Sequence, residues 1–144
     1  MQTLSGNPIR SDLVIYRKNS MENFGPHLTL DLKGCPQHLL SDLSLHFKWL
    51  KELPHLIDMT PITQPYVFPY EGLVPGDKGI TGIAIIAESH LSIHSFEEKG
   101  WCYIDIFSCR GFDTEKAVAI TKEFFQPTEC VVSLVERGIG FPRG

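Results

Sequence analysis

Three extended segments follow one another in this chain with only short turns between them, and this arrangement limits the fold more than any other feature. The segments cover 80–87, 90–96 and 101–108, and Gly100 lies between the second and the third. The first consists of apolar and small residues, as is typical of a buried strand. Strands that follow one another without intervening helices imply an antiparallel sheet, so we expect these segments to pair in that way.

Hydrophobic periodicity predicts two helices and further strands. Apolar residues between 39 and 50 recur at steps of three and four, which gives one apolar helical face. Pro36 can begin this helix, and Pro54 is expected to end it. The other expected elements are a strand over 27–32, a loop over 54–79 that allows a short strand at 66–68, a helix from Asp113 or Thr114 to Pro127, and a strand over 130–135. The predicted fold class is α+β, a two-layer sandwich with both helices on one face of an antiparallel sheet.

Length and composition indicate one soluble domain. The chain has 144 residues, of which we assign 24–144 to the domain and 1–23 to an N-terminal extension whose residues 13–16 could dock as a strand. A net charge of −4 leaves no basic footprint for nucleic acid. No apolar stretch approaches the roughly 20 residues that a membrane span needs. The start lacks the pattern of a signal peptide, and the four cysteines lack zinc-ribbon spacing, so we expect a cytoplasmic protein with free thiols.

The stretch Glu88–Glu97 carries the residue types of a nucleophilic site. Ser89 follows a glutamate, His94 lies five positions after the serine, and Cys109 lies twenty positions after it. A serine can attack only if a base takes its proton and a donor holds the developing oxyanion. In a regular strand, residues five apart face opposite sides, so Ser89 and His94 would diverge. We therefore expect a bend or bulge near 88–91, or a scissile bond at the very end of the strand.

Four motifs occur in an order that is similar to a known family. They are Gly25-Pro-His-Leu28, Gly79-Ile-Thr-Gly82, Glu88-Ser-His-Leu-Ser-Ile-His94 and Asp105-Ile-Phe-Ser-Cys109. From about Phe24 to Glu136 the chain resembles the small bacterial and archaeal S-adenosylmethionine decarboxylases. Members of this family make a pyruvoyl cofactor by cutting their own chain before a serine.

The resemblance implies a cut between Glu88 and Ser89, which would give two chains, 1–88 and 89–144. The Ser89 hydroxyl would attack the Glu88 carbonyl and turn the peptide into an ester, and the second chain would finally begin with a pyruvoyl group. That group would form a Schiff base with a substrate amine and serve as the electron sink for decarboxylation, as pyridoxal phosphate does elsewhere.

The resemblance also implies roles for three residues outside the scissile bond. His94 would transfer protons during self-cleavage, because histidine changes its charge near neutral pH. Thr81 would keep the hydroxyl that family members often place there as serine, and it would assist the cleavage. Cys109 would donate the proton that replaces the lost carboxylate.

Substrate binding is expected at Phe96 and Glu98, which stand at the family positions for adenine and ribose. Phe68 is the candidate for a second aromatic on the adenine, in a region that is longer here than usual. S-adenosylmethionine is the favoured substrate, and its decarboxylation would supply the aminopropyl donor for spermidine synthesis. One alternative is a pyruvoyl-dependent arginine or ornithine decarboxylase. A second is an uncleaved, non-enzymatic relative that binds or regulates a partner.

Two further expectations concern assembly and metals. Small members of the family pair as homodimers of cleaved protomers with active sites across the interface, so the resemblance implies such a dimer here. His90 and His94 would suit zinc on a helix, but the segment is predicted to be a strand and no third ligand is spaced for it, so we predict no metal site.

Overall fold

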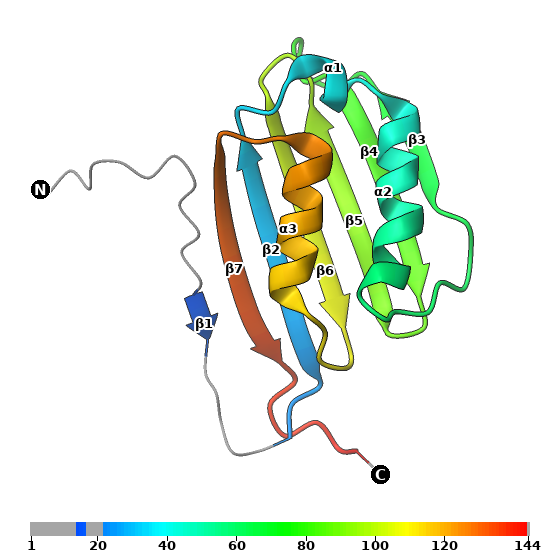
Figure 1. Ribbon diagram of the computed structural model, residues 1–144, viewed down its shortest axis with the longest axis vertical. Helices are drawn as coiled ribbons and strands as arrows, with labels where there is room; N and C mark the ends of the chain where they lie inside the picture. Colours follow the sequence, from blue (N-terminus) through cyan, green and yellow to red (C-terminus); the bar gives the residue numbers. More distant parts are fainter. Residues whose placement is uncertain (1–13, 17–21, 144) are drawn as a thin grey trace, which may run out of the picture.

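Seven strands form one sheet in the part of the chain that the structure describes (Figure 1). This computed structural model describes residues 14–16 and 22–143. The sheet order is β1-β7-β2-β6-β5-β4-β3, with β1 at Val14–Tyr16, β2 at Gly25–Lys33, β3 at Tyr66–Tyr70, β4 at Gly79–Ile86, β5 at Ser89–Phe96, β6 at Trp101–Ser108 and β7 at Glu129–Arg137. From β7 to β3 all neighbours pair antiparallel, which confirms the prediction, whereas β1 pairs parallel with β7.

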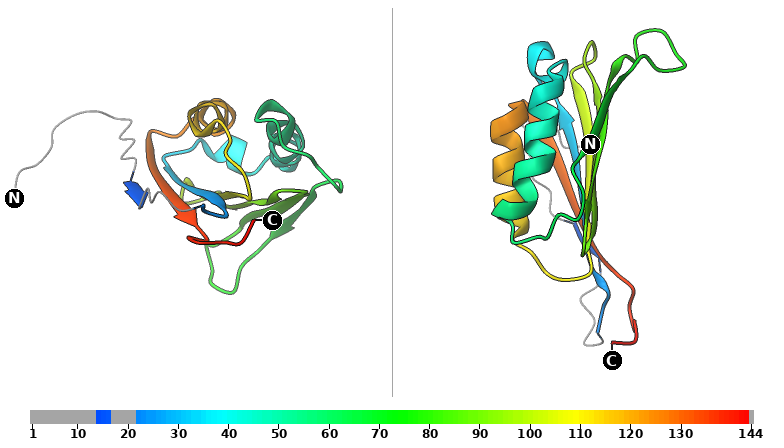
Figure 2. Two further views of the ribbon diagram at one scale, coloured as in Figure 1. Left: turned by 90° about the horizontal axis from the view of Figure 1, so that it is seen from below. Right: turned by 90° about the vertical axis from the view of Figure 1, so that its right-hand side faces the viewer.

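The helices form a second layer on one face of this sheet. They are α1 (Gln37–Leu40), α2 (Leu43–Leu56) and α3 (Thr114–Phe125), and Figure 2 shows all of them on the same side. The predicted α+β sandwich is therefore confirmed. The opposite face, which we call the open face, carries no helix among the described residues.

The core lies between the two layers and is built by alternation along the strands. In β2, Leu28, Leu30 and Leu32 are fully buried and face the helices, while the residues between them are partly exposed. Fully burying one such side chain contributes about 1.5–3 kcal/mol. Trp49 of α2 is also fully buried, and its indole N–H donates to the Thr121 hydroxyl of α3 at 3.1 Å, which joins the two helices.

The predicted helix start near Pro36 agrees with α1, but the prediction of one continuous helix that ends at Pro54 was wrong. The chain forms α1 and α2 as separate helices. The N-cap of α2 is Asp42, whose carboxylate accepts a hydrogen bond of 3.0 Å from a backbone N–H of the first turn. Such a cap stabilises a new helix start. Pro54 lies inside the last turn of α2 rather than after it. There its missing N–H leaves one carbonyl of the preceding turn without an intrahelical donor, only two residues before the helix ends.

The edge strand β3 and the loop that follows it stand next to the site described below. β3 includes Pro69, which an edge strand tolerates because one side of its backbone needs no partner. The loop 71–78 projects from the open face (Figure 2). The sequence predicted a strand only over 66–68, so β3 is longer than expected.

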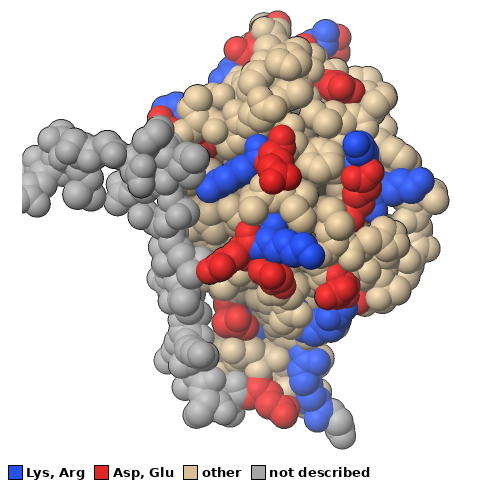
Figure 3. Space-filling view, viewed as in Figure 1, with Lys and Arg blue, Asp and Glu red and all other residues tan. Residues whose placement is uncertain are grey.

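The surface over the helices carries charges of both signs. Over the helical face, acidic and basic side chains are interspersed (Figure 3).

Within 14–16 and 22–143, no helix has both the length and the apolar character to cross a membrane. β1 agrees with the short docked strand expected in the extension, but residues 1–13 and 17–21 lie outside the described part, so the boundary at residue 23 stays a prediction.

Candidate active site

The Glu88–Ser89 peptide bond lies in the tight turn that joins β4 to β5. β4 ends at Ile86 and β5 begins at Ser89, so the bond stands at the end of a strand, the second of the two positions expected from the sequence. Ser89 has a φ of +157°, which non-glycine residues rarely adopt. Residues held in sparsely populated backbone regions store strain, and such residues cluster at functional sites.

The backbone of Cys109 contacts the carbonyl group of this bond. Ser89 pairs with Ser108 across β5 and β6, and Cys109 follows directly. Its N–H donates a hydrogen bond of 2.8 Å to the Glu88 carbonyl oxygen. A donor at this position would stabilise negative charge that develops on that oxygen. The fold thus brings together Glu88, Ser89 and Cys109, which we call the cleavage half-site.

The side chain of Glu88 is held as firmly as its carbonyl. The carboxylate accepts hydrogen bonds from the N–H of Thr60 at 3.1 Å and from its hydroxyl at 3.0 Å, and the guanidinium of Arg110 lies 3.3 Å away. Burial alone would raise the pKa of the Glu88 carboxyl, but these hydrogen bonds and the Arg110 charge outweigh it and lower the pKa. Sequence reasoning missed Thr60 and Arg110, since nothing in the motifs relates them to Glu88.

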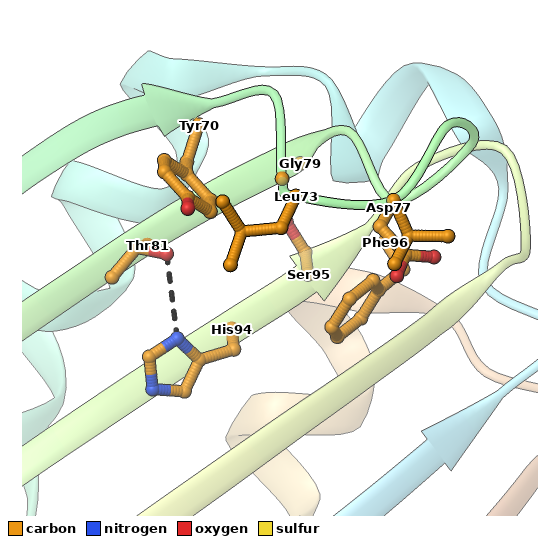
Figure 4. A pocket seen from close by; sticks show the side chains of 10 residues that line it. Tyr70, Leu73, Asp77, Gly79, Thr81, His94, Ser95 and Phe96 are labelled. Carbon is orange, nitrogen blue, oxygen red and sulfur yellow. Dashed lines mark hydrogen bonds between the residues drawn. The ribbon is translucent and has the colours of Figure 1, made fainter.

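A second group of candidate residues borders a pocket on the open face. The hydroxyl of Thr81 lies 3.3 Å from Nδ1 of His94, and both side chains border a cavity of about 390 Å³ (Figure 4). Phe96 lines the same cavity. We call Thr81, His94 and Phe96 the pocket half-site. The full lining is Tyr70, Gly72, Leu73, Val74, Asp77, Gly79, Thr81, His94, Ser95 and Phe96.

The two half-sites stand at opposite ends of β5. An antiparallel strand rises about 3.4 Å per residue, so the five-residue step from Ser89 to His94 corresponds to roughly 17 Å. Leu91, Ile93 and Ser95 face the helices and are buried, whereas His94 is exposed on the open face. One chain therefore does not bring the expected nucleophile and the expected base together.

The structure places the other two expected substrate residues outside the pocket lining. Phe68 is half-exposed on β3, opposite Thr81, while Tyr70 two residues later lines the cavity. Glu98 lies in the turn between β5 and β6, and the acidic residue of the lining is Asp77, which forms an ion pair with Lys99. Tyr70 directly precedes the loop 71–78, and Asp77 lies within it. The unusual length of this region was the only sequence signal that pointed to these two residues.

Three of the cysteines are structural. Cys35, Cys102 and Cys130 are buried, as expected, and burial raises the pKa of Cys35 to about 12. Cys109 is partly exposed. Across the described ranges no group of three His, Cys, Asp or Glu side chains is arranged to hold a metal ion.

A buried polar pair between α2 and β5 was not foreseen. His46 is fully buried; its Nε2 lies 3.0 Å from the Ser95 hydroxyl and its Nδ1 2.8 Å from the Asp42 carbonyl oxygen. Burial lowers the pKa of His46, although the Asp42 carbonyl acts in the opposite direction. This pair fixes α2 against the end of β5 that carries the pocket half-site.

Comparison with known proteins identifies the family of this chain. A family model described as S-adenosylmethionine decarboxylase matches residues 26–138. The chain belongs to this family. It is 32% identical over 120 residues to the S-adenosylmethionine decarboxylase proenzyme of Thermomicrobium roseum, a match that covers 83% of this chain and 97% of the relative. A proenzyme of the same name from Clostridium botulinum is 36% identical over 104 residues, covering 72% of this chain and 84% of the relative.

A solved structure supports the fold of this family. The crystal structure of the adenosylmethionine decarboxylase from Aquifex aeolicus superimposes with a TM-score of 0.70 at 23% identity, and the match covers 85% of this chain and 98% of that one. The family model and the two proenzymes confirm the family expected from the four motifs, and with it the enzyme class, a carboxy-lyase.

Proposed function

We propose that this protein is a pyruvoyl-dependent S-adenosylmethionine decarboxylase that forms its own cofactor by cutting the Glu88–Ser89 bond. The hydrogen bond from the Cys109 N–H to the Glu88 carbonyl oxygen carries this proposal. It supplies a donor at the oxygen that would become negative, beside a serine with an unusual backbone conformation. Family membership supports the same reaction, because the relatives are named proenzymes.

Self-cleavage needs an attack, a bond break and a hydrolysis. The Ser89 hydroxyl loses its proton to a base and attacks the Glu88 carbonyl carbon, while the Cys109 N–H holds the oxyanion. Collapse breaks the C–N bond and leaves an ester between Glu88 and Ser89. Loss of the Ser89 Cα proton then expels the Glu88 carboxylate and leaves dehydroalanine, which water converts to a pyruvoyl group and ammonia. The Thr60 and Arg110 contacts keep Glu88 fixed throughout.

The residues at the cut fit the group that would form there. A pyruvoyl group supplies an electrophilic carbonyl that condenses with a substrate amine and withdraws electrons as CO₂ leaves. The Cys109 N–H is hydrogen-bonded to the Glu88 carbonyl and Cys109 is partly exposed, which supports its thiol as the proton donor.

We infer that the complete site forms between two copies of the chain. The cleavage half-site lacks His94, the expected base, and the pocket half-site lacks Ser89, the expected nucleophile. Packing two open faces about a two-fold axis would place the Ser89 end of one β5 against the His94 end of the other. Large apolar side chains exposed on this face support the pairing; by strand register they are Tyr66, Phe68, Tyr70, Ile83, Tyr103, Val131 and Val135. His94, assisted by Thr81, would then accept the Ser89 proton of the partner.

The pocket half-site would bind the substrate. Its volume of about 390 Å³ lies in the range of small-molecule sites. Phe96 is the first aromatic for adenine, and the lining supports Tyr70 beside or instead of Phe68 as the second. The names of the relatives favour S-adenosylmethionine over arginine or ornithine. The product would donate aminopropyl groups for spermidine synthesis, and four free cysteines favour a reducing, cytoplasmic setting.

Intact mass spectrometry tests the self-cleavage. We expect two chains, 1–88 and 89–144, the second carrying a pyruvoyl start, and we expect one uncut chain from Ser89→Ala. A cut Ser89→Ala protein would contradict the serine assignment. An uncut wild-type protein would instead favour the non-enzymatic, regulatory alternative.

Carboxyl-labelled substrates test the specificity. Release of labelled CO₂ from S-adenosylmethionine is expected, and the Ser89→Ala protein serves as the inactive control. Release from arginine or ornithine instead would favour the alternative decarboxylases.

A further inference from the structure

The segment that follows β7 returns to the cleavage half-site and contacts it through one arginine. The guanidinium of Arg143 donates hydrogen bonds to the carbonyl oxygens of Cys109 and Phe24, and its Nε donates to that of Asn23 at 3.2 Å. One side chain thus links the exit of β6 to the residues that lead into β2. The family model ends at residue 138, so Arg143 lies outside the matched region.

An aromatic cluster fixes the position of this arginine. Its guanidinium lies 5.7 Å from the ring of Phe24 and 5.6 Å from that of Phe141, and those two rings pack edge to face at 4.8 Å. Gly138 has a φ of +68°, and a Cβ there would lie 2.4 Å from the Cβ of Phe24. The turn after β7 therefore needs glycine to bring Phe141 and Arg143 back over Phe24.

The backbone at Cys109 is held from several sides. On one side, Gly25 approaches so closely that a Cβ would lie 1.9 Å from the Ser108 carbonyl oxygen. The Cys109 N–H donates a hydrogen bond to the Glu88 carbonyl oxygen, and the Cys109 carbonyl oxygen accepts one from the Arg143 guanidinium. A guanidinium is always charged and presents donors in a planar fork, so it can hold several carbonyl oxygens at once.

We propose that Arg143 is a positioning residue that holds the Cys109 backbone in place for self-cleavage and for proton donation. This inference rests on the proposed function. Without Arg143 the Cys109 carbonyl loses its charged donor, and residues 108–110 gain freedom relative to Glu88. The Cys109 N–H would then hold the oxyanion less well, and the thiol would be less well aimed. The contacts of Arg143 are with backbone carbonyl oxygens and with the rings of Phe24 and Phe141, none of which lines the pocket, so substrate affinity should not change.

The test compares Arg143→Ala and Arg143→Lys with Lys116→Ala, which removes a positive charge from an exposed position on α3. Self-cleavage is followed after synthesis by denaturing electrophoresis, and kcat and KM for S-adenosylmethionine are measured on the fully cleaved fraction. We expect Arg143→Ala to slow cleavage and lower kcat, each roughly tenfold, with KM unchanged, because it loses charge-assisted hydrogen bonds. Arg143→Lys should fall between Arg143→Ala and the wild type, and thermal denaturation should show all variants folded.

The outcomes separate this inference from the function on which it rests. If wild type is cut and Arg143→Ala matches Lys116→Ala in cleavage and kcat, the positioning role is refuted and the function stands. A rise in KM equal to the fall in kcat, or no rescue by lysine in a folded protein, would also refute it. An uncut wild-type chain would overturn both.

Discussion

The N–H of Cys109 lies 2.8 Å from the carbonyl oxygen of Glu88, and this contact joins the exit of β6 to the turn before β5. It places the expected proton donor of one reaction beside the expected scissile bond of another. The same short stretch of backbone would therefore serve self-cleavage first and decarboxylation afterwards. Self-cleavage would occur once in each chain, whereas decarboxylation would occur in every catalytic cycle.

The contacts of Thr60 and Arg110 with the Glu88 carboxylate, which we call the Glu88 clamp, should set the rate of self-cleavage. Arg110→Ala removes the charged partner of the Glu88 carboxylate, and Thr60→Val removes the hydroxyl donor, so each should slow the appearance of the two chains about tenfold. Time courses by electrophoresis measure this. In the double variant Arg110→Ala with Glu88→Gln the effects should be less than additive, because the residues contact each other. Fully additive effects would place Arg110 outside the clamp.

Two inactive variants should restore each other if the site is shared between copies. His94→Ala retains Ser89, and Ser89→Ala retains His94, so neither should be cut alone. When both are produced in the same cells, mixed dimers contain one complete site, and the His94→Ala chain should be cut in a substantial fraction of molecules. Mass spectrometry identifies which chain is cut. The absence of any cleavage in verified mixed dimers would rule out a shared site.

Tyr70 and Phe68 can be separated by their effect on substrate affinity. Because Tyr70 lines the pocket, Tyr70→Ala should raise the KM for S-adenosylmethionine about tenfold by removing a face for adenine to stack on. Phe68→Ala, which shortens the half-exposed neighbour two residues away, should raise KM much less. Steady-state kinetics of the cleaved proteins decide this, and the reverse order would assign the second aromatic to Phe68.

Because of His46, the free energy of unfolding should decrease as the pH is lowered below about 6.5, the ordinary pKa of histidine. Its pKa is lowered from 6.5 in the folded protein, so below about pH 6.5 the unfolded chain binds a proton that the folded one does not. The free energy of unfolding should therefore decrease as pH falls, with a slope of up to about 1.4 kcal/mol per pH unit from this group. Urea denaturation across pH 5–8 measures it.

A variant without the titrating group gives the control for His46. His46→Gln should be less stable at neutral pH but should lose most of this slope, whereas His38→Gln, at an exposed position of α1, should keep it. An unchanged slope in His46→Gln would show that another group is responsible, such as His90, whose pKa burial also lowers.

The sequence predicted the layers because the relevant signals are local. Alternation at Leu28, Leu30 and Leu32 marks the buried face of β2, and the period of two also predicted that Ser89 and His94 would diverge. The break between α1 and α2 could have been predicted from the sequence, because Asp42 is a good capping residue directly before Leu43. It was missed because the apolar period continues across the break.

The contacts that hold Glu88 could not be predicted in the same way. Thr60 stands 28 positions before it and Arg110 stands 22 positions after it, each in an irregular segment. No periodicity relates such residues, and only the folded backbone brings them together. The same holds for Arg143, which lies 34 positions from Cys109.

The strand order has a consequence for the mature molecule. In β7-β2-β6-β5-β4-β3, the piece 1–88 supplies β2, β4 and β3, and the piece 89–144 supplies β7, β6 and β5. β2 thus lies wedged between two strands of the other piece. After cleavage, the two chains would stay associated through strand pairing without a covalent bond between them. Once unfolded, they would have to meet by diffusion before they could refold together. Renaturation of the matured protein should therefore become bimolecular and depend on concentration, while the uncut precursor refolds as a single unit.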